Sequence, residues 1–360
     1  MNLHELLTQK VDTWRGQGYR HDTYSTIAEI LEWARNPEGS GFHLRPPQIR
    51  ALETYWYLRL VEKTPHIFDL YRSCYPRIAD LHKVLGVPDA AFQEVNYEPD
   101  ELWHKIREDD SFVRTFKLEM LRETLALRYP SYILALAVGA GKTALIGAII
   151  ATEFATAFEY PKGPFVQNAL VFAPGKTIIV YLRQLAELRY NRILPPRLYK
   201  RFAASLKMTF TRDGERDIPV IRGSLFNLIV TNTEKIRIQK ETVRKKDLGP
   251  LFAYQKEDAA REEVANRRLR RIASLPHLAV FSDEAHHTYG QSLDTELKKV
   301  RKTVDYLSDN TNVVCVINTT GTPCFRRKPF LDVVIWYGLS QGIRDHILKE
   351  VRQDIPPITG

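Results

Sequence analysis

Cysteine is scarce in this chain of 360 residues, which contains only Cys74, Cys315 and Cys324. Three scattered cysteines are too few for a disulfide framework or a four-cysteine zinc site. This scarcity favours a reducing, intracellular compartment, and we expect a cytoplasmic protein. The N-terminus, MNLHELLTQKVDTWRGQG, is charged from its start and therefore differs from a secretory signal.

Long apolar runs without charge are also missing. The most apolar stretch, YILALAVGAGKTALIGAII, has Lys142 near its centre, preceded by Gly139 and Gly141. A lysine in that place argues against a membrane span, and we expect no membrane partner. Internal repeats and low-complexity tracts are absent too, and a hydrophobic content of 44% fits a soluble globular protein of more than one domain.

Positive charge exceeds negative charge, with 52 lysines and arginines against 43 acidic residues and a formal net charge of +9. Such a balance favours a polyanionic partner, although charge alone does not decide for nucleic acid. The most charged stretch, residues 235–271, contains VRKKD and NRRLRR. We expect a solvated helical hairpin there, and the alternative is an insertion that faces nucleic acid.

The pattern of apolar residues changes near residue 130. Before it, STIAEILEWARN and IRALETYWYLRLVEK have the three-to-four spacing of helices, with Pro46 and Pro47 ahead of the second. After it, short apolar runs alternate with helical segments: YILALAV, NALVFAP, NLIVT, HLAVFSD and NVVCVIN. Runs of this kind are typical of strands buried on both faces, so the sequence predicts an α/β fold with a mostly parallel sheet.

A glycine-containing turn lies between the first predicted strand and the helix after it. In LAVGAGKTALIGAII the turn is Gly139, Ala140, Gly141, Lys142 and Thr143. Glycines let the backbone approach a phosphate closely, and the helix N-terminus adds partial positive charge. Lys142 is expected to reach the β and γ phosphates of ATP, and the Thr143 hydroxyl to ligate Mg²⁺. The usual G-x-x-x-x-G-K-[ST] pattern begins with Gly, where this chain has Leu136.

Two acids and two histidines follow another apolar strand in VFSDEAHHTYG. A zinc site, a general-base pair and the magnesium end of a nucleotide site are the alternatives. Zinc needs three or four ligands, and adjacent His286 and His287 on a helix would point about 100° apart. With a phosphate turn nearby, we expect Asp283 to hold Mg²⁺ and Glu284 to polarise the attacking water. His286 is expected to contact the γ-phosphate or a neighbouring lobe.

Weaker signals lie at the ends of other strands. Thr320 and Thr322 of NTTGTPC form either an ordinary turn or a hydroxyl switch beside the carboxylates. Hydroxyl, amide and ammonium groups suited to a phosphodiester backbone are offered by Pro174, Lys176, Thr231 and Thr233. Upstream, FHLRPPQIRALE carries Arg45 and Gln48, whose amide suits the adenine edge, and Phe42, which is placed to stack on the base.

Taken in order, these stretches resemble a superfamily 2 DEAD/DEAH-box helicase. The matching segments are LRPPQ (Q motif), AVGAGKT (motif I), VFAPGKT (motif Ia), IVTNTEK (motif Ib), DEAH (motif II) and TTGTP (motif III). They are similar to the Res helicase subunit of type III restriction enzymes and to related defence helicases, in which a non-glycine at the Leu136 position is tolerated. The resemblance implies a RecA-like lobe that binds ATP and Mg²⁺.

The chain departs from the family in two places. The 94 positions from Gln48 to Lys142 are more than the family usually has, so we expect a helical insertion at residues 61–130. A second RecA-like lobe with an arginine-bearing motif VI is not recognisable. We therefore expect a helical N-terminal region (1–130), RecA-like lobe 1 (131–328), and the start of a connection to a second lobe (329–360). That lobe would lie beyond residue 360 or in a partner subunit.

The resemblance implies ATP hydrolysis that drives movement on nucleic acid. We expect double-stranded DNA, in restriction or phage defence. Two alternatives remain open. One is an RNA helicase lobe, since motifs that grip phosphates do not report the sugar. The other is a nucleotide-gated binding or scaffold module without turnover of its own.

Overall fold

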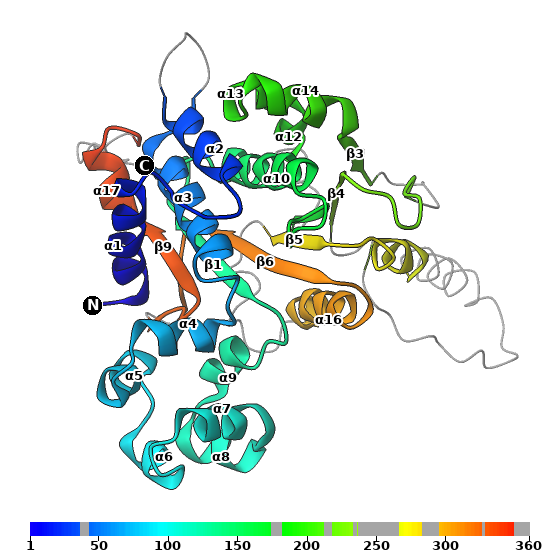
Figure 1. The fold of residues 1–360 in the computed structure, drawn as a ribbon. Coiled ribbons are helices and arrows are strands. Elements are labelled where there is room, and N and C mark those ends of the chain that lie inside the picture. The colour runs from blue at the N-terminus through cyan, green and yellow to red at the C-terminus, as the bar shows by residue number, and fades with distance from the viewer. Residues whose placement is uncertain are drawn as a thin grey trace, which may run out of the picture.

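The computed structural model describes residues 1–36, 43–173, 182–211, 218–232, 236, 266–282, 295–325 and 328–348. At its centre lies a seven-stranded parallel sheet in the order β3-β4-β2-β5-β6-β1-β9 (Figure 1). Its strands are β1 (Ser131–Leu136), β2 (Asn168–Ala173), β3 (Lys207–Phe210), β4 (Asn227–Asn232), β5 (Leu278–Ser282), β6 (Val313–Thr320) and β9 (Val333–Tyr337). A small antiparallel pair joins β7 (Cys324–Phe325) to β8 (Lys328–Pro329).

The sheet confirms the predicted α/β fold and the predicted strands. All the apolar runs that follow residue 130 in the sequence analysis became strands: β1, β2, β4, β5 and β6. Their two faces are both buried. In β2, Ala169 and Val171 join one hydrophobic cluster, while Leu170 and Phe172 join a second cluster on the other face. Burial of both faces explains why these runs are continuously apolar rather than alternating.

Helices cover both faces of the sheet, as Figure 1 shows. One layer packs on the cluster that contains Ala169: α1 (Leu3–Gly16), α2 (Thr26–Arg35), α3 (Pro46–Leu60), α10 (Lys142–Glu159), α12 (Gln184–Glu187), α13 (Tyr190–Ile193) and α14 (Pro196–Ser205). The other face is covered by α16 (Thr295–Asn310), through Val304 and Leu307, and by helical residues 266–272. No helix among the described residues is both long and apolar enough to cross a membrane.

The residues at which a helical insertion is expected, 61–130, fold as a group of short helices up to residue 125. They are α4 (Ile67–Cys74), α5 (Ile78–Leu85), α6 (Asp89–Glu94), α7 (Pro99–Glu108), α8 (Asp110–Phe116) and α9 (Glu119–Leu125). Figure 1 shows α5 to α8 at the bottom of the view, far from α10 and from α17 (Leu339–Arg344). The Tyr71 hydroxyl joins the group to the segment just before β9 by donating to the carbonyl of Leu331, at 2.8 Å.

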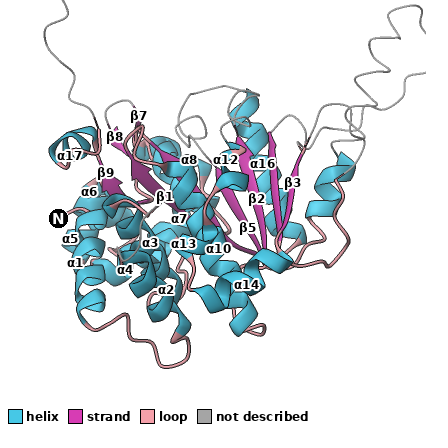
Figure 2. Cartoon of the chain, turned by 90° about the horizontal axis from the view of Figure 1, so that it is seen from above, coloured by secondary structure: helices cyan, strands magenta, loops and turns pink. Residues whose placement is uncertain are grey.

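The strand β9 lies beside β1 at one edge of the sheet. In Figure 2 it lies at the α1 end and β3 at the other end. His4 of α1 packs on Trp336 of β9, with ring centroids 5.6 Å apart. Residues 333–337 are thus part of the same sheet as β1. The expected domain boundaries at 130 and 328 stay predictions.

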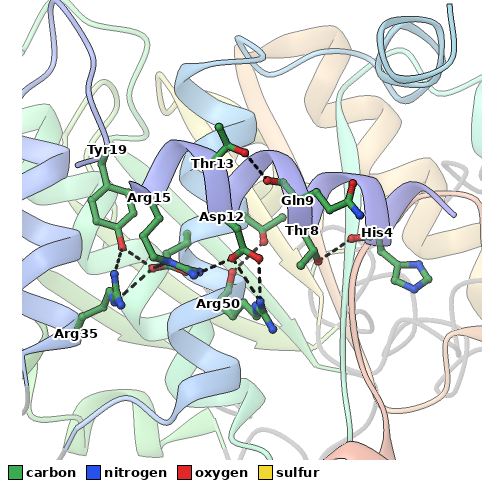
Figure 3. A network of polar contacts seen from close by, with 11 residues as sticks. His4, Thr8, Gln9, Asp12, Thr13, Arg15, Tyr19, Arg35 and Arg50 are labelled. Carbon is green, nitrogen blue, oxygen red and sulfur yellow. Dashed lines mark hydrogen bonds and ion pairs between the residues drawn. The ribbon is translucent and has the colours of Figure 1, made fainter. Parts of the chain in front are cut away.

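The helix α3 is fixed to its neighbours by two buried acids. Glu53 is in contact with Arg15, Tyr19 and Arg35, which lie together in Figure 3. Further along α3, Arg59 forms an ion pair with Glu153 of α10, with Nε and Oε1 2.6 Å apart. Both partners of that pair are buried. The end of α3 is therefore held against α10, and its middle against the N-terminal helices.

Candidate phosphate-binding site

The predicted phosphate turn lies between the end of β1 and the start of α10. Gly139 and Gly141 have φ angles of +85° and +91°, in the left-handed region that side chains disfavour. The amide of Ala140 donates to the carbonyl of Ala137 at 3.0 Å, which closes the turn. The turn leads directly into an 18-residue helix, whose N-terminal N–H groups lack partners within the helix. This arrangement is suited to bind an anion.

Gln48 reaches the turn from α3. Its side-chain Nε2 donates to the carbonyl of Gly141 at 2.8 Å, and its Oε1 accepts from the backbone amide of Arg45 at 2.7 Å. The side chain is 3% exposed. A Cβ on Gly141 would lie only 2.2 Å from Nε2, so the close approach requires glycine. The contact between Gln48 and the turn spans the whole insertion.

Arg45 reaches the same turn. Its Nη1 donates to the carbonyl of Gly139 at 2.9 Å. Pro46 and Pro47 occupy the first positions of α3, where the missing N–H has no helical partner and the fixed φ suits a helix start. The prolines therefore set where α3 begins, and this places Arg45 and Gln48 over the turn. Sequence reasoning did not predict that these two side chains bind carbonyls of the turn.

Lys142 is the first residue of α10 and is buried. Beside it lies the turn after β6: a Cβ on Gly321 would be 3.6 Å from the Lys142 Nζ and 3.0 Å from Val138 Cγ2. Glycine at position 321 thus leaves room next to the ammonium group. The TGT segment approaches Lys142 through its glycine. The sequence analysis assigned a role only to the two threonines of this segment.

The predicted threonines fall into different surroundings. Thr143, in the first turn of α10, is partly exposed, as a ligand of a soluble metal ion would have to be. Thr320 is buried and its Oγ1 accepts from the amide of Thr322, at 3.1 Å, while Thr322 is exposed. Thr231 is fully buried in β4 and its hydroxyl accepts from Thr211 at 2.9 Å. This placement gives no support to the predicted contact of Thr231 with nucleic acid.

Several predicted site residues lie outside the part of the chain that the structure describes: Phe42, Pro174, Lys176, Thr233, Asp283, Glu284 and His286. The described strand β5 ends at Ser282, which pairs in register with Asn318 of β6. Asp283 therefore follows directly, in sequence, the carboxyl end of a central strand. Most of the charged stretch at 235–271 also lies outside the described residues.

The described residues hold no preformed metal centre. Among them, no group of three or more His, Cys, Asp and Glu side chains is arranged to hold a metal ion. The donor set that the sequence predicts for Mg²⁺ joins Thr143 to Asp283, and only Thr143 is described. The turn itself fits a phosphate group, because the two left-handed glycines let the backbone approach closely and Lys142 adds a positive charge at the start of α10.

The parallel sheet and the glycine turn before α10 are those of a RecA-like α/β lobe. The family model for the type III restriction enzyme, res subunit, matches residues 113–325, which is more than half of the chain. The chain therefore belongs to this family, whose domain is the N-terminal lobe of an ATP-dependent motor. The match does not reach Gln48. A comparison with curated proteins gives no significant match.

Proposed function

We propose that this chain is the ATP-binding lobe of a DNA translocase. The observation that carries the proposal is the pair of hydrogen bonds from Arg45 and Gln48 to the carbonyls of Gly139 and Gly141. These bonds join a segment like the Q motif to a turn like motif I, although 94 positions separate Gln48 from Lys142. The contact brings the candidate adenine-binding segment to the candidate phosphate turn, as a single nucleotide site requires.

Each group has a role in this proposal. Lys142 binds the β and γ phosphates, and Thr143 and Asp283 hold Mg²⁺, which neutralises phosphate charge when bound. Glu284 orients the attacking water and accepts its proton, and His286 contacts the γ-phosphate. Gln48, Arg45 and Phe42 form the adenine end. Thr320 and Thr322 transmit the state of the nucleotide to the nucleic-acid side of the lobe.

The nucleic acid is double-stranded DNA in this proposal, in restriction or phage defence within the cytoplasm. The net charge of +9 and the family support a polyanionic partner. Pro174, Lys176 and Thr233 are the proposed contacts, and Thr231, which is buried in β4, is left out of them. Turnover needs a second RecA-like lobe, because an arginine from such a lobe stabilises the charge that develops in phosphoryl transfer. In this proposal such a lobe completes the catalytic site.

The test is phosphate release by the wild-type protein and by Glu284→Gln, with the second lobe added in trans. Duplex DNA and single-stranded RNA are compared at the same nucleotide concentration. We expect DNA to stimulate wild-type turnover and Glu284→Gln to bind ATP without turnover, since an amide takes no proton from water. Greater stimulation by RNA would favour an RNA helicase. Equal turnover of wild type and Glu284→Gln would contradict the assignment of Glu284.

A further inference from the structure

The chain returns to the phosphate turn after the last strand. Leu348 lies four residues after the end of α17, and its Cδ2 is 3.1 Å from the position of a Cβ on Gly139. Gly139 is the residue whose carbonyl accepts from Arg45 on α3. One residue of the turn is thus in contact with two segments that are far apart in the sequence.

A local set of hydrogen bonds fixes Leu348. The amides of Ile347 and Leu348 both donate to the carbonyl of Gly342, at 2.9 Å each. His346 turns the chain with a φ of +55°. Gly342 makes the return possible, because a Cβ there would lie 2.4 Å from Leu348 Cδ1 and 2.8 Å from its Cγ.

The returning segment is also attached to the sheet. The Tyr337 hydroxyl donates to Oδ2 of Asp345 at 2.9 Å, and the carbonyl of Tyr337 accepts from the amide of Ala137, also at 2.9 Å. Ala137 is the residue whose carbonyl accepts from Ala140 and closes the phosphate turn. The segment from Tyr337 to Leu348 therefore contacts Ala137 through the backbone, and Gly139 through a side chain.

From this arrangement we propose that Leu348 is a positioning residue for the phosphate turn. Its side chain packs against Gly139 and limits the turn to the conformation in which its amides face a phosphate. Movement of residues 339–348 is thereby coupled to nucleotide affinity, and nucleotide binding stabilises the turn at residues 345–348 in return. The inference rests on the proposed ATP binding and adds a residue that acts through Gly139.

The experiment measures ATP·Mg²⁺ affinity by calorimetry for the wild type and three variants. Leu348→Ala removes the contact, Gly342→Ala displaces the Leu348 side chain, and Leu348→Met keeps a side chain of similar volume. We expect about tenfold weaker binding for the two alanine variants, because a turn that is no longer held in place has to be ordered when the nucleotide binds. Leu348→Met is expected to bind as the wild type does. Leu339→Ala is the matched control, because Leu339 is an exposed leucine at the other end of α17.

A second readout separates positioning from loss of stability. Hydrogen exchange is followed in the wild type with and without ATP·Mg²⁺, and we expect nucleotide to protect the amides of Ile347 and Leu348. Absence of that protection overturns the proposal, even where an alanine variant does not fold. Equal affinity in the wild type and both alanine variants overturns it too. A wild type that binds no ATP would instead refute the proposed function on which the inference depends.

Discussion

At the scale of single residues, the site depends on places where a Cβ would not fit. A Cβ on Gly141 would lie 2.2 Å from Gln48 Nε2, and a Cβ on Gly321 would lie close to Val138 and Lys142. Gly141 also has a left-handed φ, so a side chain there would meet both strain and collision. The glycine pattern was visible in the sequence, but the neighbours that require it were not, because they come from distant segments.

Gln48→Ala separates two roles for this side chain. An adenine contact predicts that the variant loses preference for ATP over GTP and keeps its affinity for inorganic tripolyphosphate. The bond to Gly141 predicts that tripolyphosphate binding weakens as well, because the turn loses a hydrogen bond worth roughly 0.5–1.5 kcal/mol. We expect the variant to lose its preference for ATP over GTP and also to bind tripolyphosphate more weakly, as measured by calorimetric titration with the three ligands. Unchanged binding of all three by the variant would leave Gln48 without a part in the nucleotide site.

At the scale of elements, α3 connects the N-terminal helices to the phosphate-turn helix. Glu153 of α10 accepts from Arg59, from the Tyr55 hydroxyl at 2.6 Å and from the amide of Val166 at 2.8 Å. All its partners are buried in the same core. A buried ion pair with satisfied hydrogen bonds is weak evidence of a more stable fold. Removing one partner, however, leaves a buried charge unpaired and lowers the free energy of unfolding strongly. The orientation of α3 is specified by this network.

Arg59→Met is therefore expected to destabilise the fold strongly. Removing one partner of a buried ion pair typically costs about 3–5 kcal/mol. The matched control on the same helix is Arg50→Met, because Arg50 is half-exposed and lies 3.3 Å from Asp12. An exposed pair of that kind contributes about 0–1 kcal/mol. Denaturant unfolding measures both values, and similar losses in the two variants would contradict the assigned importance of Glu153.

The start of α4 depends on a neutral histidine. His66 Nδ1 accepts from the amide of Phe68 at 3.3 Å, and Nε2 donates to the carbonyl of Leu127 at 2.5 Å. Burial lowers the pKa of His66, and Arg107 lowers it further, while the Leu127 carbonyl and Asp69 oppose the shift. A proton on Nδ1 would remove the acceptor that caps the helix.

The stability of the fold should therefore decrease as the pH falls. Below the unfolded pKa of about 6.5, the unfolded chain binds the His66 proton more readily than the folded one. The stabilisation that comes from neutral His66 is complete above that pH. It is lost as the pH falls toward the lowered pKa of His66 in the folded state. We expect His66→Asn, which retains a capping side chain, to show a shallower loss of melting temperature from pH 8 to pH 5. Parallel profiles for variant and wild type would count against this role.

At the scale of the whole molecule, the sheet was predictable and the assembly of the site was not. The strands β1, β2, β4, β5 and β6 were found because strands buried on both faces are continuously apolar. The edge strand β3, whose residues are only partly buried, has no such run and was missed. No sequence pattern around Leu348 indicates its role, because that role depends on where α17 ends in space. The meeting of Gln48 with the phosphate turn followed from the resemblance, because periodicity cannot report contacts across an insertion.

The central claim is that the turn from Gly139 to Thr143 binds the phosphates of ATP, and calorimetric titration of ATP·Mg²⁺ tests it most directly. The wild type is compared with Lys142→Ala and with Lys162→Ala, a control at an exposed lysine after α10. Loss of a charge-assisted hydrogen bond costs roughly 1.5–3 kcal/mol, so Lys142→Ala should bind at least about tenfold more weakly. Lys162→Ala should bind as the wild type does. Equal affinity in the wild type and Lys142→Ala would contradict the account.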